Sequence, residues 1–281
     1  MIKKINSRMI GAIKAMTTPL VLVSVLSSPL TNAYADQEQR TCSSIVATGN
    51  PEYPPFLWHA EQGNELHGAL ANLMGEISER INIPIETVYV GPWSRSQQEV
   101  RSGRVDLMAG AFYTSERADY MEYFSPAMMF TKSVVWQSNA APFEYQGWND
   151  LVGRWGVTVI NNSFGQEFDT FAKQHLNVLT VASLEQALSM LGAGRADYVL
   201  YERNPGVAYV QKLGLEGVRY VEPAISGEGL FLTISKMSPC NSPEIKGKIA
   251  DALRDLVAEG EPQVVLINAL EEWRSNTFPS P

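Results

Sequence analysis

The sequence predicts an α/β protein with two lobes. Short apolar runs alternate with amphipathic helical patterns along most of the chain, which is typical of a parallel or mixed sheet covered by helices. Two similar blocks of strand, helix and strand follow one another, and this repetition indicates two lobes. The chain of 281 residues can bury a core of that size, either as one large domain or as two smaller ones.

The first 35 residues are typical of a secretory signal peptide. Four basic residues precede the apolar run at residues 20–26, and the small-residue motif A-Y-A follows at residues 33–35. A membrane anchor is the alternative, but the run is too short to span hydrocarbon, and Pro19 and Pro29 flank it. We expect cleavage after Ala35 and export to the periplasm.

The charge of the chain excludes some classes of partner. Removing the four basic residues of the signal segment would leave 18 Lys and Arg against 30 Asp and Glu, a formal charge of −12 in place of −8. Such an acidic protein is poorly suited to binding nucleic acid or anionic lipid. No later stretch is apolar for long enough to suggest a membrane span.

The first block of elements follows the signal segment. Residues 44–48 predict a strand, which ends in a loop at Gly49. Apolar residues at helical spacing from 70 to 81 predict a helix, and β-branched residues from 85 to 90 predict a strand. A second helix extends to residue 101 and stops at Gly103, and the next strand covers 105–111.

The second block repeats the pattern with different residues. Strands are expected at 154–159, 178–181 and 196–201, with a helix at 166–175 between the first two. Ser183 and Gln186 fit a capping box at the start of another helix, which ends near residue 192. Pro205 suits the first position of the helix that follows.

The remaining residues are expected to return to the first lobe. A strand at 218–221, a glycine-rich turn at 226–229 and a buried strand at 230–234 precede two helices, at 243–258 and 261–273. We therefore expect lobe 1 at residues 36–133 and 227–281 and lobe 2 at 134–226. The two strands that cross between them, near 131–137 and 223–231, would form a hinge.

The chain has two cysteines, Cys42 and Cys240. Export exposes them to an oxidising compartment, so we predict a disulfide between them. Two free buried thiols are the alternative.

The chain lacks the common motifs of metal and cofactor enzymes. Its three histidines are not at ligand spacing, and no H-E-x-x-H, phosphate-binding loop, G-x-G-x-x-G or G-x-S-x-G motif occurs. We therefore expect no cofactor and no metal.

Aromatic and polar residues gather where the predicted strands end. Ligands of open α/β sheets bind at the carboxyl ends of the strands. Core or rim packing is the alternative for each residue taken alone. The candidates are Asn50, Tyr53 and Phe56 after the first strand, Trp93 after the second, and Phe112, Tyr113 and Thr114 after the third.

These residues lie in motifs that resemble those of the extracytoplasmic solute-binding proteins of family 3, which serve ABC importers of polar amino acids. The resemblance covers nearly the whole chain after the signal segment. It implies a type II periplasmic binding fold with two lobes, each a mixed sheet flanked by helices, joined by a two-strand hinge. The motifs are G-N-P-E-Y-P-P-F at 49–56, G-R-V-D at 103–106, T-S-E-R at 114–117, F-S-P at 124–126, and G-R-A-D at 194–197 with an acid five residues further on.

The resemblance assigns roles to residues on both lobes. Arg117 would hold the α-carboxylate of a ligand, which a guanidinium fork matches in geometry. Asn162, Ser163 and Phe164 lie in the loop that would close on that carboxylate. Glu202 stands where the family has an aspartate for the α-ammonium group. The alternatives are a surface ion pair for Arg117 and a plain helix cap for Ser163.

Some residues depart from the family pattern. Glu202 is longer than aspartate, Asn50 replaces a commoner aspartate, and Phe112 and Tyr113 stand where small serines are frequent. Bulk at Phe112 and Tyr113 should shrink or reshape the pocket.

We expect a monomeric periplasmic receptor that closes on a small zwitterion or carboxylate, with an ABC permease as its membrane partner. Two other functions remain open: an enzyme similar to cyclohexadienyl dehydratases, with Glu202 as general acid, and a receptor that feeds a membrane signalling protein.

Overall fold

The computed structural model describes residues 42–60 and 62–277. The expected signal peptide, residues 1–35, lies outside the described residues. None of the helices in the described ranges combines the length and the hydropathy that a membrane span requires.

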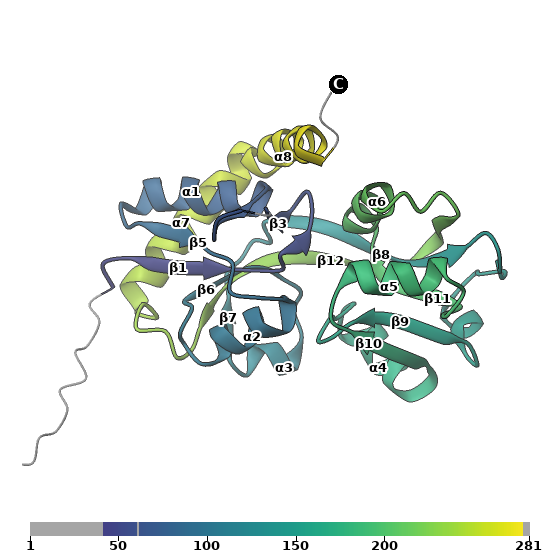
Figure 1. Ribbon diagram of the computed structural model, residues 1–281. Helices are drawn as coiled ribbons and strands as arrows, with labels where there is room; N and C mark the ends of the chain where they lie inside the picture. Colours follow the sequence, from purple (N-terminus) through teal and green to yellow (C-terminus); the bar gives the residue numbers. More distant parts are fainter. Residues whose placement is uncertain (1–41, 61, 278–281) are drawn as a thin grey trace, which may run out of the picture. The chain divides into compact units, whose positions relative to one another are not determined.

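The described residues form an α/β fold with a long sheet and a small second sheet (Figure 1). The strands are β1 (Ile45–Thr48), β2 (Glu52–Tyr53), β3 (Leu57–His59), β4 (Leu66–His67), β5 (Ile85–Thr87), β6 (Leu107–Ala111), β7 (Met121–Tyr123), β8 (Met129–Ser138), β9 (Trp155–Val159), β10 (Asn177–Val181), β11 (Tyr198–Glu202) and β12 (Val218–Ser235). The helices are α1 (Ala69–Ile81), α2 (Trp93–Arg101), α3 (Ser115–Ala118), the 3-10 helix η1 (Trp148–Leu151), α4 (Gln166–His175), α5 (Leu184–Gly192), α6 (Arg203–Lys212), α7 (Pro243–Glu259) and α8 (Glu261–Thr277).

The sheet follows the order β10-β9-β11-β8-β12-β6-β1-β5, with β7 paired to β12 outside this path. In lobe 1, β5, β1 and β6 are parallel and β12 is antiparallel to β6. In lobe 2, β10, β9 and β11 are parallel and β8 is antiparallel to β11. Each lobe therefore contains a mixed sheet, as the sequence predicts.

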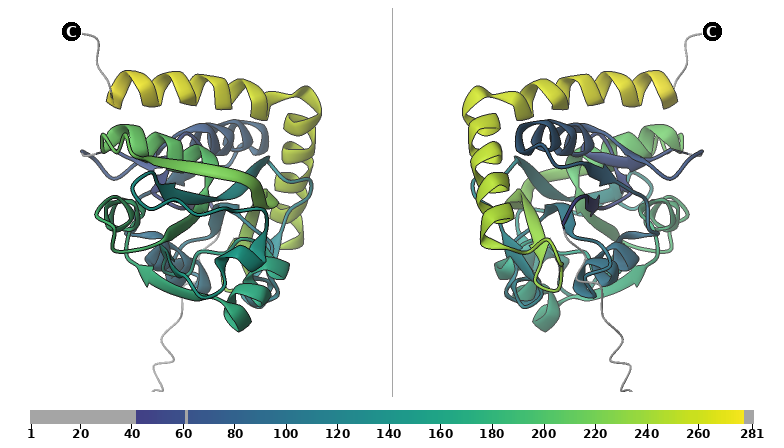
Figure 2. Two further views of the ribbon diagram at one scale, coloured as in Figure 1. Left: turned by 90° about the vertical axis from the view of Figure 1, so that its right-hand side faces the viewer. Right: turned by 90° about the vertical axis from the view of Figure 1, so that its left-hand side faces the viewer.

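Strand alternation distributes the core of lobe 1 over both faces of its sheet. On β6, Leu107 and Ala109 belong to the core that includes α1 and α7, whereas Met108 belongs to a second cluster with Trp93 of α2. Figure 1 shows α1 and α7 on one side of these strands and α2 and α3 on the other. Helix α8 packs against α1, which Figure 2 shows from two sides.

Lobe 2 is built by the same rule. On β11, Val199 and Tyr201 face the core that contains residues of α5, while Tyr198 and Leu200 face a separate cluster with Phe168 of α4. Both faces of β11 are thus covered, which explains why all five of its residues are buried. Glu202 is the last of these residues, so the strand carries a carboxyl group into a buried position.

Two strands join the lobes. Residues 129–133 of β8 pair with 226–230 of β12, and residues 135–138 of β8 pair with 218–221 of β12. The register is irregular between Val221 and Ser226. The sequence predicted a turn at 226–229, and this was wrong, because these residues continue β12 as one strand of 18 residues. The lobe boundaries expected at residues 133 and 226 stay a prediction.

Most of the other expected elements occur within a few residues of their predicted positions. Helix α4 has the predicted bounds, and Ser183 Oγ caps α5 by accepting from the Gln186 N–H at 3.1 Å. The reciprocal bond of the capping box differs, since Gln186 Oε1 accepts from the N–H of Ala182. Pro205 is the third residue of α6 and not the first. The small sheet β2-β3-β4 was not predicted.

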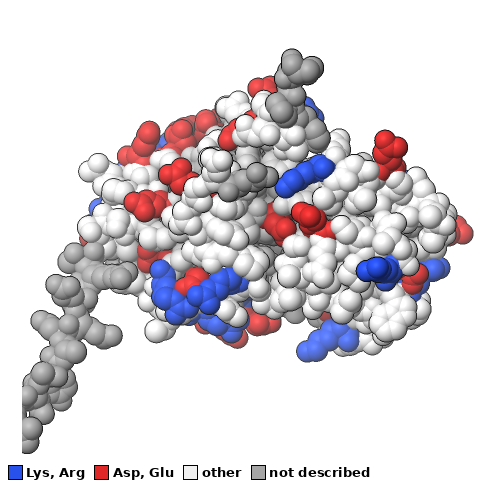
Figure 3. Space-filling model, viewed as in Figure 1, with Lys and Arg blue, Asp and Glu red and all other residues white. Residues whose placement is uncertain are grey.

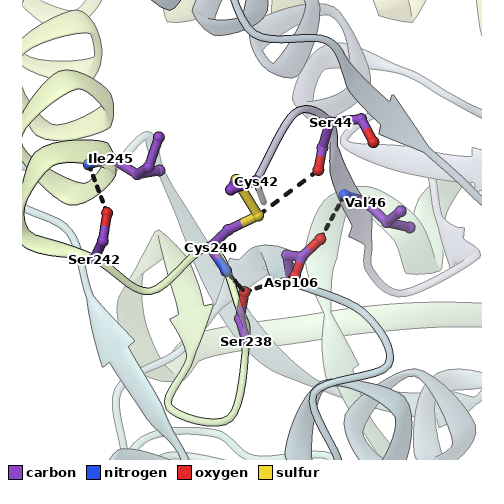
Figure 4. Close-up of a disulfide and its surroundings, with 8 residues drawn as sticks. All are labelled: Cys42, Ser44, Val46, Asp106, Ser238, Cys240, Ser242 and Ile245. Carbon is purple, nitrogen blue, oxygen red and sulfur yellow. Dashed lines mark hydrogen bonds between the residues drawn. A yellow bond between two sulfur atoms is a disulfide. The ribbon is translucent and has the colours of Figure 1, made fainter. Parts of the chain in front are cut away.

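A disulfide joins Cys42 to Cys240 across 198 residues, with their Cα atoms 5.0 Å apart. Figure 4 shows it beside Asp106, whose carboxylate accepts from the N–H of Val46 at 2.9 Å and from Ser238 Oγ at 2.6 Å. The predicted disulfide is present. Together with Asp106 it ties the start of β1 to the segment that precedes α7.

On the face drawn in Figure 3, basic side chains gather where α2 and α3 lie. Arg95 and Arg104 both pair with Glu99, and Arg101 pairs with Glu116 at 3.3 Å. Local acids therefore offset much of this basic charge, in agreement with the net acidity of the chain.

Candidate ligand-binding site

The candidate site lies where the strands of both lobes present their carboxyl ends to the cleft between the lobes. Lobe 1 contributes the segments after β1 and β6 and the start of α2. Lobe 2 contributes the end of β11 and the loop between β9 and α4. This is the position at which ligands bind in open α/β sheets.

Arg117 points into the cleft and is 5% exposed. Thr114 is the N-cap of the short helix α3, and its Oγ1 accepts from the N–H of Arg117 at 3.1 Å. The guanidinium donates from Nη1 to the carbonyl of Phe112 at 3.3 Å and from Nη2 to the carbonyl of Asn161 at 3.1 Å. Among the described residues Arg117 has no carboxylate partner within 4.0 Å, so the surface ion pair considered as the alternative does not form.

Three donors of lobe 1 converge on one carbonyl oxygen of lobe 2. Trp93 Nε1, Gln97 Nε2 and Arg117 Nη2 donate to the oxygen of Asn161 at 3.2, 3.2 and 3.1 Å. The left-handed backbone of Asn161, with φ of 61°, lies in a region that asparagine tolerates better than most residues. The guanidinium also lies 5.3 Å from the centre of the Trp93 ring. Such a set of donors suits an oxygen that carries negative charge.

Glu202 is buried opposite these donors and is 1% exposed. Its Oε2 has no hydrogen-bond partner among the described residues. Burial raises the pKa of Glu202 to about 8, and the negative charge of Asp169 adds to this rise, while the positive charge of Arg117 opposes it. The site therefore contains a carboxyl group that favours its neutral form at neutral pH until a cation approaches it.

Aromatic side chains help to line the cavity that Arg117 and Glu202 share. The cavity there has a volume of about 10 Å³. It is lined by Asn50, Tyr53, Trp93, Gly110, Phe112, Arg117, Asn162, Glu202 and Leu230. Seven of the twelve residues that the sequence suggested as ligand-binding thus surround one cavity.

Phe56 and Tyr113 lie outside the lining of this cavity. Phe56 is buried behind Tyr53, with the ring centres 5.3 Å apart. Tyr113 is 53% exposed and packs edge-on against Tyr123. Phe112 and Tyr113 directly follow β6, and successive side chains there point to opposite sides. Only Phe112 therefore adds bulk to the cavity.

The residues of the loop before α4 have different roles. Asn162 lines the cavity, and its Nδ2 has no partner among the described residues. Ser163 Oγ donates to Asp169, whose other oxygen accepts from the N–H of Phe164 at 2.8 Å. The Phe164 ring packs against Phe168 in the core of lobe 2. Ser163 therefore fixes the loop, and Phe164 anchors it.

A polar groove of about 1040 Å³ adjoins the cavity and shares Arg117 and Asn162 with it. Thr114 and Ser163 line this groove and not the cavity. The groove also contains side chains of α2 and α4, among them Arg101, Asp169 and Lys173. It forms a polar, charged approach to the smaller cavity.

Several contacts across the cleft involve groups that the sequence did not reveal. Tyr201 OH accepts from Asn50 Nδ2 at 3.0 Å, and Glu52 Oε2 accepts from the N–H of Leu184 at the start of α5 at 3.1 Å. On the groove side, Gln166 Oε1 accepts from both the N–H and the Oγ of Ser115, at 3.1 and 2.9 Å. We name these three pairs the latch contacts. They join the lobes on both sides of the cavity.

No group of three or more His, Cys, Asp or Glu residues suited to a metal ion occurs in the described part of the chain.

Comparisons with known proteins agree with this architecture. The family described as bacterial extracellular solute-binding proteins, family 3, matches residues 45–266. Comparison with the curated proteins finds no match.

Solved structures resemble the chain over most of its length. A histidine kinase sensor domain with similarity to periplasmic binding proteins has 22% identity and a TM-score of 0.71, covering 81% of this chain and 96% of that one. A mutant of ArgBP from T. maritima has 20% identity and a TM-score of 0.68, covering 85% and 98%. AbpA from Streptococcus pneumoniae, an amino acid ABC transporter substrate-binding protein bound to L-arginine, has 18% identity and a TM-score of 0.67, covering 85% and 97%. At these identities the likeness establishes the fold, which is that of the type II periplasmic binding proteins.

Proposed function

Because the chain belongs to the bacterial extracellular solute-binding proteins of family 3, we propose that it captures a small amino acid in the periplasm and delivers it to an ABC importer. The signal segment expected at residues 1–35 would direct export. The disulfide between Cys42 and Cys240 suits an oxidising compartment.

The observation that supports this proposal most is that a guanidinium from one lobe and a carboxyl group from the other line one cavity. Arg117 stands on lobe 1 and Glu202 on lobe 2, and both line the same cavity. An α-carboxylate would replace the Asn161 carbonyl as acceptor of the lobe 1 donors. An α-ammonium would lie against Glu202 and the aromatic faces of Tyr53 and Trp93, which favour cations.

Binding of this kind would drive closure of the lobes. A ligand held by Arg117 and Glu202 touches both lobes only when they are together, so it shifts the population toward the closed form. The latch contacts would then add to that stability. An importer would recognise the closed arrangement.

The Arg117→Lys variant tests the proposal, because it keeps the charge and removes the guanidinium fork. We expect amino acid affinity to fall by about 1.5–3 kcal/mol, the usual value of a hydrogen bond to a charged group. Stability without ligand should change little, since the Asn161 carbonyl still accepts from Trp93 and Gln97. Isothermal titration calorimetry and thermal melting measure the two effects.

Arg101→Lys is the matched control. Arg101 also lines the groove, but its guanidinium stacks on Tyr120 at 4.3 Å and pairs with Glu116. We expect this variant to bind like the wild type. Equal affinity losses in both variants, or a large loss of ligand-free stability in Arg117→Lys alone, would assign Arg117 a structural role.

An enzymatic function is the second candidate, and the raised pKa of Glu202 favours it. A carboxylic acid with a pKa of about 8 beside an arginine could act as a general acid on a bound carboxylate. Incubation of the purified protein with prephenate or arogenate, followed by detection of an aromatic product, tests this function. Turnover that disappears in Glu202→Gln would establish it in place of transport.

The membrane partner could also be a sensor. The histidine kinase sensor domain that resembles this chain shows that the fold occurs in signalling proteins. Co-purification with membrane proteins encoded by neighbouring genes distinguishes a permease from a kinase.

A further inference from the structure

The cavity between Arg117 and Glu202 is small for an amino acid. Its volume of about 10 Å³ corresponds to roughly one water molecule. A ligand gains further room only where it displaces a contact or holds the lobes apart. The walls of the cavity therefore decide which ligands the closed form can hold.

Phe112 is a buried wall of the cavity whose backbone is held by two hydrogen bonds. Its side chain is 3% exposed, and its carbonyl accepts from Arg117 Nη1 at 3.3 Å and from Tyr123 OH at 3.0 Å. These two bonds fix the backbone that carries the ring. Moving the ring outward would require a change in this segment or a strained rotamer.

The wall formed by Tyr53 is braced as well. Tyr53 packs against Phe56 at 5.3 Å and against Tyr201 at 6.2 Å, measured between ring centres. Tyr201 in turn bonds Asn50 across the cleft. A side chain directed toward Tyr53 would therefore meet a buried aromatic cluster and not solvent.

A side chain that extends toward the groove must pass Arg117, which lines both spaces. Trp93 and Arg117 both donate to the carbonyl of Asn161, and the guanidinium lies over the Trp93 ring. This hydrogen-bonded set stands between the cavity and the groove. If the ligand carboxylate takes the place of the carbonyl, it occupies that same opening.

Partial opening of the cleft would make room only at the expense of the latch contacts. A side chain that holds the lobes apart separates Ser115 from Gln166 and Glu52 from the start of α5. A longer ligand therefore loses closure contacts that a short ligand keeps.

We infer that the site selects the smallest α-amino acids, of the size of glycine or alanine, and that Phe112 is the residue that sets this limit. The inference rests on the proposed capture of amino acids. It adds the size class of the ligand and the side chain that enforces it. Discrimination of one methylene in a closed apolar pocket amounts to about 10- to 200-fold in specificity.

Calorimetric titrations with glycine, alanine, glutamine and arginine test the inference on the wild type and on Phe112→Ser. We expect the wild type to bind glycine or alanine at least about 100-fold more tightly than glutamine or arginine. Phe112→Ser removes the ring and should bind the longer amino acids at least about tenfold more tightly than the wild type does.

Tyr113→Ser is the matched control, because it removes the neighbouring aromatic ring, which is 53% exposed and lies outside the cavity. Its preference among the four amino acids should equal that of the wild type. If Phe112→Ser fails to fold, Phe112→Leu serves as the second variant, because it keeps a smaller apolar side chain at this position. It should shift the preference from glycine toward alanine.

The outcomes separate the inference from the proposed function. Wild-type protein that binds glutamine or arginine as tightly as glycine overturns the inference and leaves amino acid capture intact. Equal shifts in Tyr113→Ser and Phe112→Ser overturn the role of Phe112. Absence of binding by wild type and variants to all four amino acids contradicts the proposed function itself.

Discussion

At the scale of single residues, Glu202 has the most unusual environment. It ends the buried strand β11, and its Oε2 has no partner among the described residues. Removing an ionised carboxylate from water costs free energy unless a cation or donors compensate. Proteins reduce that cost by keeping the group protonated, which is why the pKa of Glu202 rises.

The pH dependence of stability follows from this shift. The pKa rises from 4.5 to about 8, so the folded chain holds the proton more tightly than the unfolded chain does. Below pH 4.5 both states are protonated and there is no penalty. Between pH 4.5 and 8 the unfolded chain ionises first, and the folded state loses relative stability until the penalty is complete above pH 8.

We therefore expect Glu202→Gln to be more stable than the wild type at high pH, with a difference that shrinks as the pH falls. The full difference has an upper bound of roughly 4–5 kcal/mol, because 1 pKa unit corresponds to about 1.4 kcal/mol and opening of the cleft would hydrate the carboxylate. Melting temperatures of both proteins from pH 5 to 9 measure it. If the difference in melting temperature between the two proteins does not change with pH, Glu202 is not a buried neutral acid.

The sequence predicted much of the site at this scale and missed groups that only the fold creates. Arg117, Glu202, Tyr53 and Phe112 lie in recognisable motifs, and the structure gathers them around one cavity. The carbonyl of Asn161 was not predictable as an acceptor, because every residue has a carbonyl and only the closed cleft brings three donors to this one. The alternation of side-chain directions after β6 could have predicted that Tyr113 lies outside the cavity.

At the scale of elements, the start of α4 is held against α3 by Gln166. Its Oε1 accepts two bonds from Ser115 on the opposite lobe. Side-chain contacts of this kind form only when the lobes meet, so they stabilise the closed arrangement and not the individual lobes. Their removal should act on closure alone.

We expect Gln166→Ala to weaken ligand binding about 2- to 12-fold, which corresponds to the 0.5–1.5 kcal/mol of a typical hydrogen bond. Gln174→Ala is the control, since Gln174 lies on the same helix and lines the same groove, and is exposed. Titration calorimetry measures affinity, and small-angle scattering measures closure. An unchanged affinity in Gln166→Ala would show that this contact does not assist closure.

The elements were predictable where local sequence decides them. Helix α4 and strand β11 follow from apolar spacing and nearby caps or turns. The turn expected at 226–229 fails because two glycines suggest a bend, whereas pairing with residues 130–133 of β8 keeps the segment extended. That partner lies about a hundred residues away, beyond the reach of local patterns.

At the scale of the whole molecule, the disulfide closes most of the described chain, up to the segment before α7, into one loop. Cys42 precedes β1 and Cys240 precedes α7, so the bond fixes the start of lobe 1 to the segment between β12 and α7. Both cysteines lie far along the strands from the cavity, at the opposite end of β1. Loss of the disulfide should therefore lower the stability of the protein and leave its ligand affinity nearly unchanged.

We expect the double variant Cys42→Ser, Cys240→Ser to lose about 2–4 kcal/mol in free energy of unfolding while its ligand affinity stays within about twofold of the wild type. Denaturant unfolding and titration calorimetry measure the two quantities. Reductant should lower the melting temperature of the wild type and leave that of the variant unchanged. Loss of affinity without loss of stability would contradict this separation.

The path of β12 has a consequence for how the protein is made. Strand β6 pairs with β12, and β12 follows all of lobe 2 in the chain. While the polypeptide emerges from its amino terminus, the edge of β6 stays uncovered until residues 230–235 have been synthesised. Lobe 1 must therefore await this last part of β12, so a chaperone that shields exposed strand edges would act mainly on lobe 1.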